Sequence, residues 1–128
     1  MRIVIIIVLC CKIMFAYDAE RAEQNLADDF ANCAAYYMLS ADGAKNSGNN
    51  DLELKLMKVS NFHYLATIEL SNEKTATAKV KLAYEKHKKT IEHHFKNFSR
   101  LLIEYNDFCQ ELSTKPQSRM KYWLDKKD

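Results

Sequence analysis

Three stretches of the chain repeat apolar residues every three or four positions, which is the spacing of one face of an α-helix. In the first stretch the repeated positions are Leu26, Phe30, Cys33, Tyr37, Ala41 and Ala44. The second follows the loop GAKNSGNND and places Leu52, Leu56, Val59, His63, Ala66 and Leu70 on one face. In the third the positions are Tyr84, His87, Ile91, His94, Phe98, Leu101, Tyr105, Phe108 and Leu112. The pattern predicts helices over residues 21–45, 52–70 and 72–112.

Helix-breaking residues are rare, with two glycines and one proline in 128 residues. Asn50 or Asp51 is a suitable N-cap for the second helix, and the sequence SNEK from Ser71 is suitable for the third. Pro116 cannot continue a helix but is well placed to begin one. The tail that follows it offers Met120, Trp123 and Leu124 as an apolar cap. The fold class predicted is all-α: a small bundle of three to four main helices plus a short C-terminal helix.

The first sixteen residues have the composition of a secretory signal peptide. Arg2 gives a positive start, an unbroken apolar run covers residues 3–10, and Ala16 is a small residue suited to cleavage. Lys12 interrupts the run before the roughly 20 apolar residues that a membrane-spanning helix needs. We therefore predict a signal peptide at residues 1–16, one helical domain at 17–128, and a secreted or periplasmic location with no stable membrane span after cleavage. An uncleaved anchor is the alternative.

Cleavage leaves two of the four cysteines, Cys33 and Cys109, both on apolar faces. In an exported chain they are expected to form one disulfide; the alternatives are buried free thiols or an intermolecular bridge. A straight helix over residues 72–112 would be about 60 Å long. It would hold Cys109 far from Cys33, whereas a disulfide needs Cα atoms within about 7 Å. The third stretch is therefore predicted to break and reverse between His87 and Ser99, with Thr90 as a candidate N-cap, giving four main helices.

Charge is balanced overall and uneven along the chain. Without Arg2 and Lys12, the 19 basic and 17 acidic residues become 17 of each, which argues against a nucleic-acid binder that relies on bulk positive charge. Residues 17–70 carry four basic and nine acidic side chains, and residues 71–100 carry eight and three. These segments are expected to pack together and neutralise each other. The alternative is a basic face for an anionic partner, formed by Lys86, Lys88, Lys89, His93, Lys96 and Arg100.

Catalytic and metal-binding patterns are weak. His87, His93 and His94, with His63 on another helix, invite a metal site, but HExxH and Glu-x-x-His pairs are absent. They are better explained as polar helix-face histidines. No serine lies in a Gly-x-Ser-x-Gly elbow, and the adjacent Asp28 and Asp29 are typical of a solvated helix start. We expect no enzyme activity, metal or cofactor.

The sequence leaves open which tyrosines are buried in the core and which line an exposed groove. Tyr37 shares the Phe30–Cys33 face, while Tyr36 points about 100° away from it. Tyr37 is expected in the core with its hydroxyl at the bundle edge. Tyr36, Tyr64 or Tyr84 is the candidate for an exposed aromatic groove that receives a partner helix or ligand.

The segments FANCAAYYMLSA and YNDFCQELSTKPQSRMKYWL resemble a class of small exported bacterial or phage-encoded helical proteins. The resemblance covers about a quarter of the chain. It implies that Cys33 and Cys109 are framework residues and that Arg119, Tyr122 and Trp123 form a C-terminal signature; it transfers no catalytic residue.

The expected function is an exported, non-enzymatic interaction protein of the cell envelope or extracellular space. Its candidate partners are another envelope or secreted protein or an anionic envelope component. The alternatives are a regulator or inhibitor of a periplasmic enzyme, such as a phage lysis-control factor, and a carrier of a small hydrophobic ligand.

Overall fold

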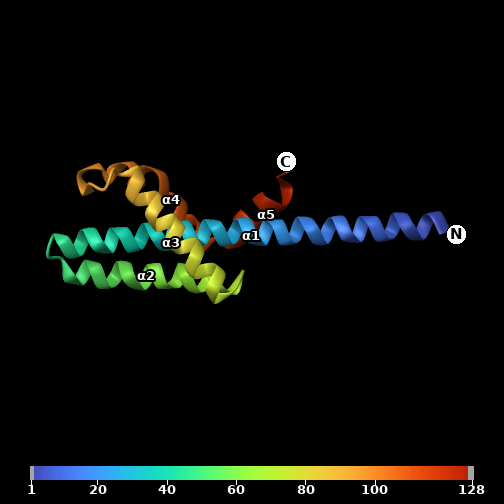
Figure 1. Cartoon of the computed structure of the whole chain (residues 1–128), viewed down its shortest axis with the longest axis horizontal. Coiled ribbons are helices and arrows are strands. Elements are labelled where there is room, and N and C mark those ends of the chain that lie inside the picture. Colours follow the sequence, from blue (N-terminus) through green and yellow to red (C-terminus); the bar gives the residue numbers. More distant parts are fainter. Residues whose placement is uncertain (1, 127–128) are drawn as a thin grey trace.

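A computed structural model shows an all-helical fold and confirms the predicted class. It describes residues 2–126, with side chains from residue 18 onward. The helices are α1 (Arg2–Asn46), α2 (Asn50–Glu69), α3 (Glu73–Thr90), the 3₁₀ turn η1 (Phe95–Asn97), α4 (Ser99–Thr114) and α5 (Pro116–Asp125). α2 runs back along α1, and α3, α4 and α5 all lie against α1, whose first part extends beyond the packed body (Figure 1).

The main core surrounds the α1 face that the periodicity predicted. Leu26, Phe30 and Cys33 are buried there against residues of α4. Six alanines of α1 are no more than 2% exposed, namely Ala22, Ala27, Ala31, Ala34, Ala35 and Ala41. Their small side chains let neighbouring helices approach closely. α5 completes the core with Met120 and Trp123, whereas Leu124, expected in the same apolar cap, is exposed.

The buried face of α2 is rotated from the predicted one: His63 is buried and Ala66 and Leu70 pack against the core as predicted, but the start of the face is not buried. Leu52 and Val59 are exposed, and the residues that α2 buries are Ser60, His63 and Thr67. Their polar atoms are satisfied locally: Ser60 donates to the carbonyl of Ala34 on α1 and Thr67 donates to the carbonyl of His63, both at 2.8 Å. Because small, hydrogen-bonded side chains meet the alanines of α1, the larger apolar residues of α2 are turned outward.

The predicted disulfide between Cys33 and Cys109 is present, with a Cα–Cα distance of 5.6 Å. The predicted reversal is confirmed as well, since α3 ends at Thr90 and α4 begins at Ser99. Glu92 and His93 adopt left-handed φ angles of 54° and 58°. The amide of His93 donates to the carbonyl of Lys88, and that of Glu92 to the carbonyl of Lys89. This is the Schellman ending that glycine usually provides.

Side chains hold the reversal in place of the missing glycine. Asn97 donates to the carbonyl of Ile91, and Arg100 donates to the carbonyl of Thr90, each at 3.1 Å. Ile91 is 1% exposed and fixes the turn against the core. Thr90 is the last residue of α3 and not the N-cap of the next helix; Phe98 occupies that position without a capping side chain. The prediction of Thr90 as an N-cap was therefore wrong.

Two other helix starts are shifted from their predicted caps. Asn49 accepts from the amide of Leu52, and Asn72 accepts from the amide of Thr75. Each lies one residue away from the predicted position, because an asparagine with a suitable φ was available there.

α1 begins far earlier than the predicted residue 21. Its backbone is helical from Arg2 through Ala16 without a break. The predicted signal peptide, residues 1–16, lies outside the residues whose side chains are described, and its cleavage stays a prediction. Within the described part of the chain no helix is long and apolar enough to cross a membrane.

Candidate functional site

The predicted basic residues gather around the α3–α4 reversal. Lys86, Lys89, His93, Lys96 and Arg100 are all exposed. Some of this charge is already neutralised within the fold, because Arg100 lies 3.5 Å from Glu92. Lys88, the sixth predicted residue, is half-buried and pairs with Glu85 at 3.5 Å.

The acidic and basic segments are in direct contact, as their composition predicted. Lys79 of α3 forms an ion pair with Asp28 of α1. Lys86, Lys89 and Lys96 have no carboxylate within 4.0 Å among the described residues, and they make up the free positive charge of this surface.

Tyr36 does not occupy the exposed position proposed for it. It is 3% exposed and stacks on Phe98 and Tyr105, with ring centroids 6.0 and 5.9 Å away. Burial raises the pKa of its phenol. Tyr37 is the more accessible of the two tyrosines, and its ring lies 5.2 Å from that of His63. The candidate exposed role of Tyr36 was therefore wrong, whereas Tyr37 is half-buried and packs against the main core as expected.

An apolar groove nevertheless lies above these tyrosines, between α2 and α4. It consists of two adjoining hollows of about 530 Å³ each, which share Tyr37 and Gln110. Its apolar walls come from Leu52, Leu56, Val59, Phe62, Phe95 and Leu102. Leu52 and Leu102 are 43% and 48% exposed, so the groove is open to solvent along its length. We name it the α2–α4 groove.

Basic residues lie at the end of the α2–α4 groove that Phe95 lines. Phe95 lines the groove and also a neighbouring hollow that contains Lys88 and His93. Lys96 follows Phe95 in the sequence, and Arg100 precedes Leu102 by two residues. Lys58 lines the other hollow of the groove, so basic residues lie near both of its ends.

The C-terminal signature residues converge on Asp29 of α1. Arg119 donates to both oxygens of this carboxylate, and the indole of Trp123 donates to Oδ2 at 2.6 Å. Asp29 is 9% exposed, so the prediction of a solvated carboxylate at a helix start was wrong for it. The reason is tertiary: α5 packs on the middle of α1 and covers the residue.

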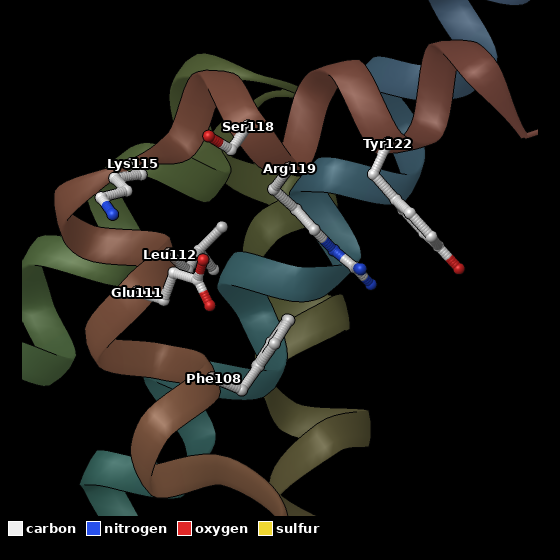
Figure 2. Close-up of a pocket in the computed structure, with 7 residues that line it drawn as sticks. All are labelled: Phe108, Glu111, Leu112, Lys115, Ser118, Arg119 and Tyr122. Atoms are coloured by element: carbon white, nitrogen blue, oxygen red, sulfur yellow. The ribbon is translucent and has the colours of Figure 1, made fainter.

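A small hollow of about 200 Å³ lies beside this cluster, between α4 and α5 (Figure 2). Arg119 and Tyr122 project into it from α5, and Phe108 and Glu111 from α4. The guanidinium of Arg119 stacks between the rings of Phe108 and Tyr122, at 5.1 and 4.3 Å. Because Arg119 is held by Asp29 and by these rings, the arrangement clamps α5 to the bundle.

Among the described residues, His63 and Ser113 most resemble a catalytic serine–histidine pair. Ser113 Oγ lies 3.2 Å from His63 Nε2, and His63 Nδ1 donates to the carbonyl of Val59 at 2.8 Å. Ser113 has one hydroxyl hydrogen, and it donates to the carbonyl of Cys109 at 2.7 Å. Both residues sit inside helices, whose backbone N–H groups are engaged and form no oxyanion hole. Because the hydroxyl hydrogen is engaged, Ser113 does not donate to His63 Nε2, and the two side chains lack the hydrogen bond of a nucleophile–base pair.

The four histidines do not form a cluster. His63 and His87 are 0% exposed, whereas His93 and His94 lie on the surface of the reversal. Polar helix-face positions were thus wrongly predicted for His63 and His87. Among residues whose side chains are described, no three potential ligands of the His, Cys, Asp and Glu types lie together as a metal site. His87 donates from Nε2 to the carbonyl of Asn32 at 3.0 Å, and its Nδ1 is buried without a partner.

The periodicity missed Phe62 and Leu102 as groove residues because it assigned one apolar face to each helix. Apolar residues outside those faces were the available signal.

No family model, curated protein or solved structure matches the chain, so the functional proposals rest on this geometry.

Proposed function

We propose that this chain is an exported, non-enzymatic helical protein that acts by binding another envelope or secreted protein. The α2–α4 groove is its contact site, and an amphipathic helix of the partner is the occupant. The single observation that carries this proposal is the open apolar groove, whose walls leave Leu52 and Leu102 nearly half exposed. Such side chains lose contact with water when a partner covers them, which favours association.

The dimensions of the groove suit a helix. Leu52 and Phe62, at its two ends, are ten positions apart on α2, which corresponds to about 15 Å or roughly three helical turns. A helix of that length presents apolar anchors at positions i, i+3 or i+4, and i+7, the mode by which amphipathic helices bind grooves.

Charge indicates which helix fits. Lys96 and His93 lie beside the end of the groove that Phe95 lines. Because these groups are exposed, they would steer an acidic partner more than they would add affinity. We therefore expect an occupant that carries carboxylates at the end that contacts Phe95.

The proposal is tested with a labelled model helix of about 15 residues that carries leucines at the anchor positions and glutamates at one end. We expect fluorescence anisotropy to show binding to the wild-type chain, and Leu102→Lys to weaken it by about tenfold or more. Ile103→Lys is the matched control, since Ile103 is 86% exposed, neighbours Leu102 and does not line the groove.

A second arm separates a protein partner from a lipid surface. Lys96→Glu is expected to weaken helix binding and reduce its salt dependence. Equal binding of the helix to Leu102→Lys and wild type would overturn the proposal. So would binding to anionic phospholipid vesicles that depends on Lys96 and is unaffected by Leu102→Lys, because it would assign the surface to lipid.

A further inference from the structure

α2 carries a second apolar stripe, outside the face that it buries against α1. It contains Leu54, Met57, Asn61, Leu65 and Ile68, whose successive spacings are three, four, four and three residues. Leu54 is 61% exposed, Leu65 51% and Met57 41%. In Figure 1 α2 lies along one edge of the body, and the start of α3 lies beside its end. Ile68, near that end, is half-buried. A helix normally shows water a polar surface, so this stripe is typical of a face that packs on another helix.

The stripe is symmetric about Asn61. Counting outward, Met57 and Leu65 lie four residues from Asn61, and Leu54 and Ile68 lie seven residues from it. Two copies of α2 placed antiparallel, with a two-fold axis at Asn61, therefore match every apolar position with an apolar position. Leu54 meets Ile68 of the second copy, Met57 meets Leu65, and Asn61 meets its own equivalent. We propose that the outer face of α2 pairs two copies of this chain in this antiparallel register.

The charges beside the stripe complement this arrangement. Lys55 and Lys58 flank it near the start of α2, and Glu69 flanks it on the same side at the end. All three are exposed. Antiparallel pairing brings Glu69 of each copy near Lys55 and Lys58 of the other. Parallel pairing would place the Lys55–Glu69 flanks on opposite sides of the seam and would not bring Glu69 near either lysine.

Asn61 favours the same register. A single asparagine within an apolar helix–helix seam is satisfied best by a second asparagine, and it thereby fixes alignment at some cost in affinity. The seam from Leu54 to Ile68 extends about 21 Å. Each α2 is already folded on its own α1, so pairing does not have to provide the cost of helix formation. We expect a reversible dimer with a dissociation constant in the micromolar range.

The apolar residues of the pairing seam are separate from the α2–α4 groove, and Lys58 lies at the border of the two surfaces. Leu52, Val59 and Phe62, on one flank of α2, line the groove, whereas Leu54 and Met57 do not. The dimer is thus independent of the proposed function, and a dimeric chain presents two grooves.

Sedimentation velocity over a concentration series tests the dimer. The full chain is used with Cys10 and Cys11 replaced by serine, in mild detergent, so that the N-terminal apolar segment does not drive association. We expect a monomer–dimer equilibrium that Leu65→Lys weakens by about tenfold or more. Leu82→Lys, on the exposed surface of α3, is the matched control and should leave the equilibrium unchanged. A chain that stays monomeric at high concentration, or one whose dimer survives Leu65→Lys, would overturn the proposal.

Charge reversal and cross-linking test the register. Lys55→Glu with Lys58→Glu should weaken the dimer, and adding Glu69→Lys should restore it. Under mild oxidation, Asn61→Cys should form a covalent dimer and Leu54→Cys alone should not, whereas a mixture of Leu54→Cys and Ile68→Cys should. Efficient self-linking of Leu54→Cys, or no rescue by Glu69→Lys, would contradict the antiparallel register.

Discussion

Arg119 and Asp29, ninety residues apart in the sequence, form a two-pronged ion pair, with Nε 2.6 Å from Oδ2 and Nη2 3.3 Å from Oδ1. The pair joins the last helix to the middle of the first. The side chains of Arg119 and Asp29 are 27% and 12% exposed, so water screens them weakly. The stability of the α5 attachment therefore depends on both partners being present.

Removing the charge of Asp29 is expected to loosen α5. Asp29→Asn leaves Arg119 without its counter-charge and should lower the free energy of unfolding by about 3 kcal/mol. Trp123, the single tryptophan, bonds to the same carboxylate and reports the change by its fluorescence. Asp28→Asn is the control: Asp28 is 53% exposed in its pair with Lys79, and its loss should cost less than about 1 kcal/mol. Equal effects of the two variants would contradict this account.

The disulfide is expected to make a large contribution to stability. Cys33 and Cys109 are 76 residues apart, and opening so long a loop should cost about 4 kcal/mol through the entropy of the unfolded chain. Urea titration of the double variant Cys33→Ser, Cys109→Ser, compared with the oxidised wild type, measures the loss. A midpoint unchanged by the substitutions would show that the helices alone hold the fold.

Acid should destabilise the protein through its buried histidines. Burial lowers the pKa of His63 and His87 below the usual 6.5, so the folded state favours the neutral rings. As the pH falls below about 6.5, the unfolded chain binds more protons than the folded one. The free energy of unfolding then decreases by up to about 1.4 kcal/mol per pH unit for each histidine, until the pH passes the lowered pKa.

Denaturant titrations between pH 5 and pH 8 reveal this dependence. His87→Gln should reduce the slope, while His94→Gln, in an exposed residue, should leave it unchanged. An identical slope in all three proteins would assign the acid sensitivity to carboxylates instead.

The left-handed turn offers a stabilising substitution. His93 is exposed and has a φ of 58°, a conformation that costs a non-glycine residue about 1 kcal/mol or more. His93→Gly relieves this strain, and after the extra entropy of glycine in the unfolded chain we expect a gain of about 0.5 kcal/mol. His94, with an extended φ of −123°, gains nothing from the same change, so His94→Gly should be neutral or destabilising. Thermal unfolding compares the two, and a higher melting temperature for His94→Gly would refute the strain argument.

The spacing of apolar residues and the scarcity of helix-breaking residues made part of the fold predictable. The α1 face around Phe30 and Cys33 is regular, and scarce glycine and proline leave helix as the default. The reversal before Ser99 was predicted although glycine is absent there, because a disulfide between Cys33 and Cys109 excludes one straight helix. Its form was not predictable, since Glu92 and His93 adopt left-handed angles only under the hold of Ile91 and Asn97.

The residues of the candidate sites were also predictable in part from the sequence. Sequence placed the exposed cations Lys86 and Lys96 in one segment, which follows from their closeness along the chain. It offered Tyr36 as a candidate for an exposed groove, which was wrong because the rings of Phe98 and Tyr105 cover Tyr36.

The sequence by itself determined that this protein is helical, that two cysteines join distant helices, and that the third apolar stretch reverses. These features depend on local spacing and chain length, which any fold of this sequence must respect. Only the tertiary structure decided how α2 is turned against α1. α2 buries Ser60 and His63 and exposes Leu54 and Leu65, because the alanine-rich surface of α1 accepts small side chains at close range. Burial is a property of two surfaces together, and a periodic pattern describes one surface at a time.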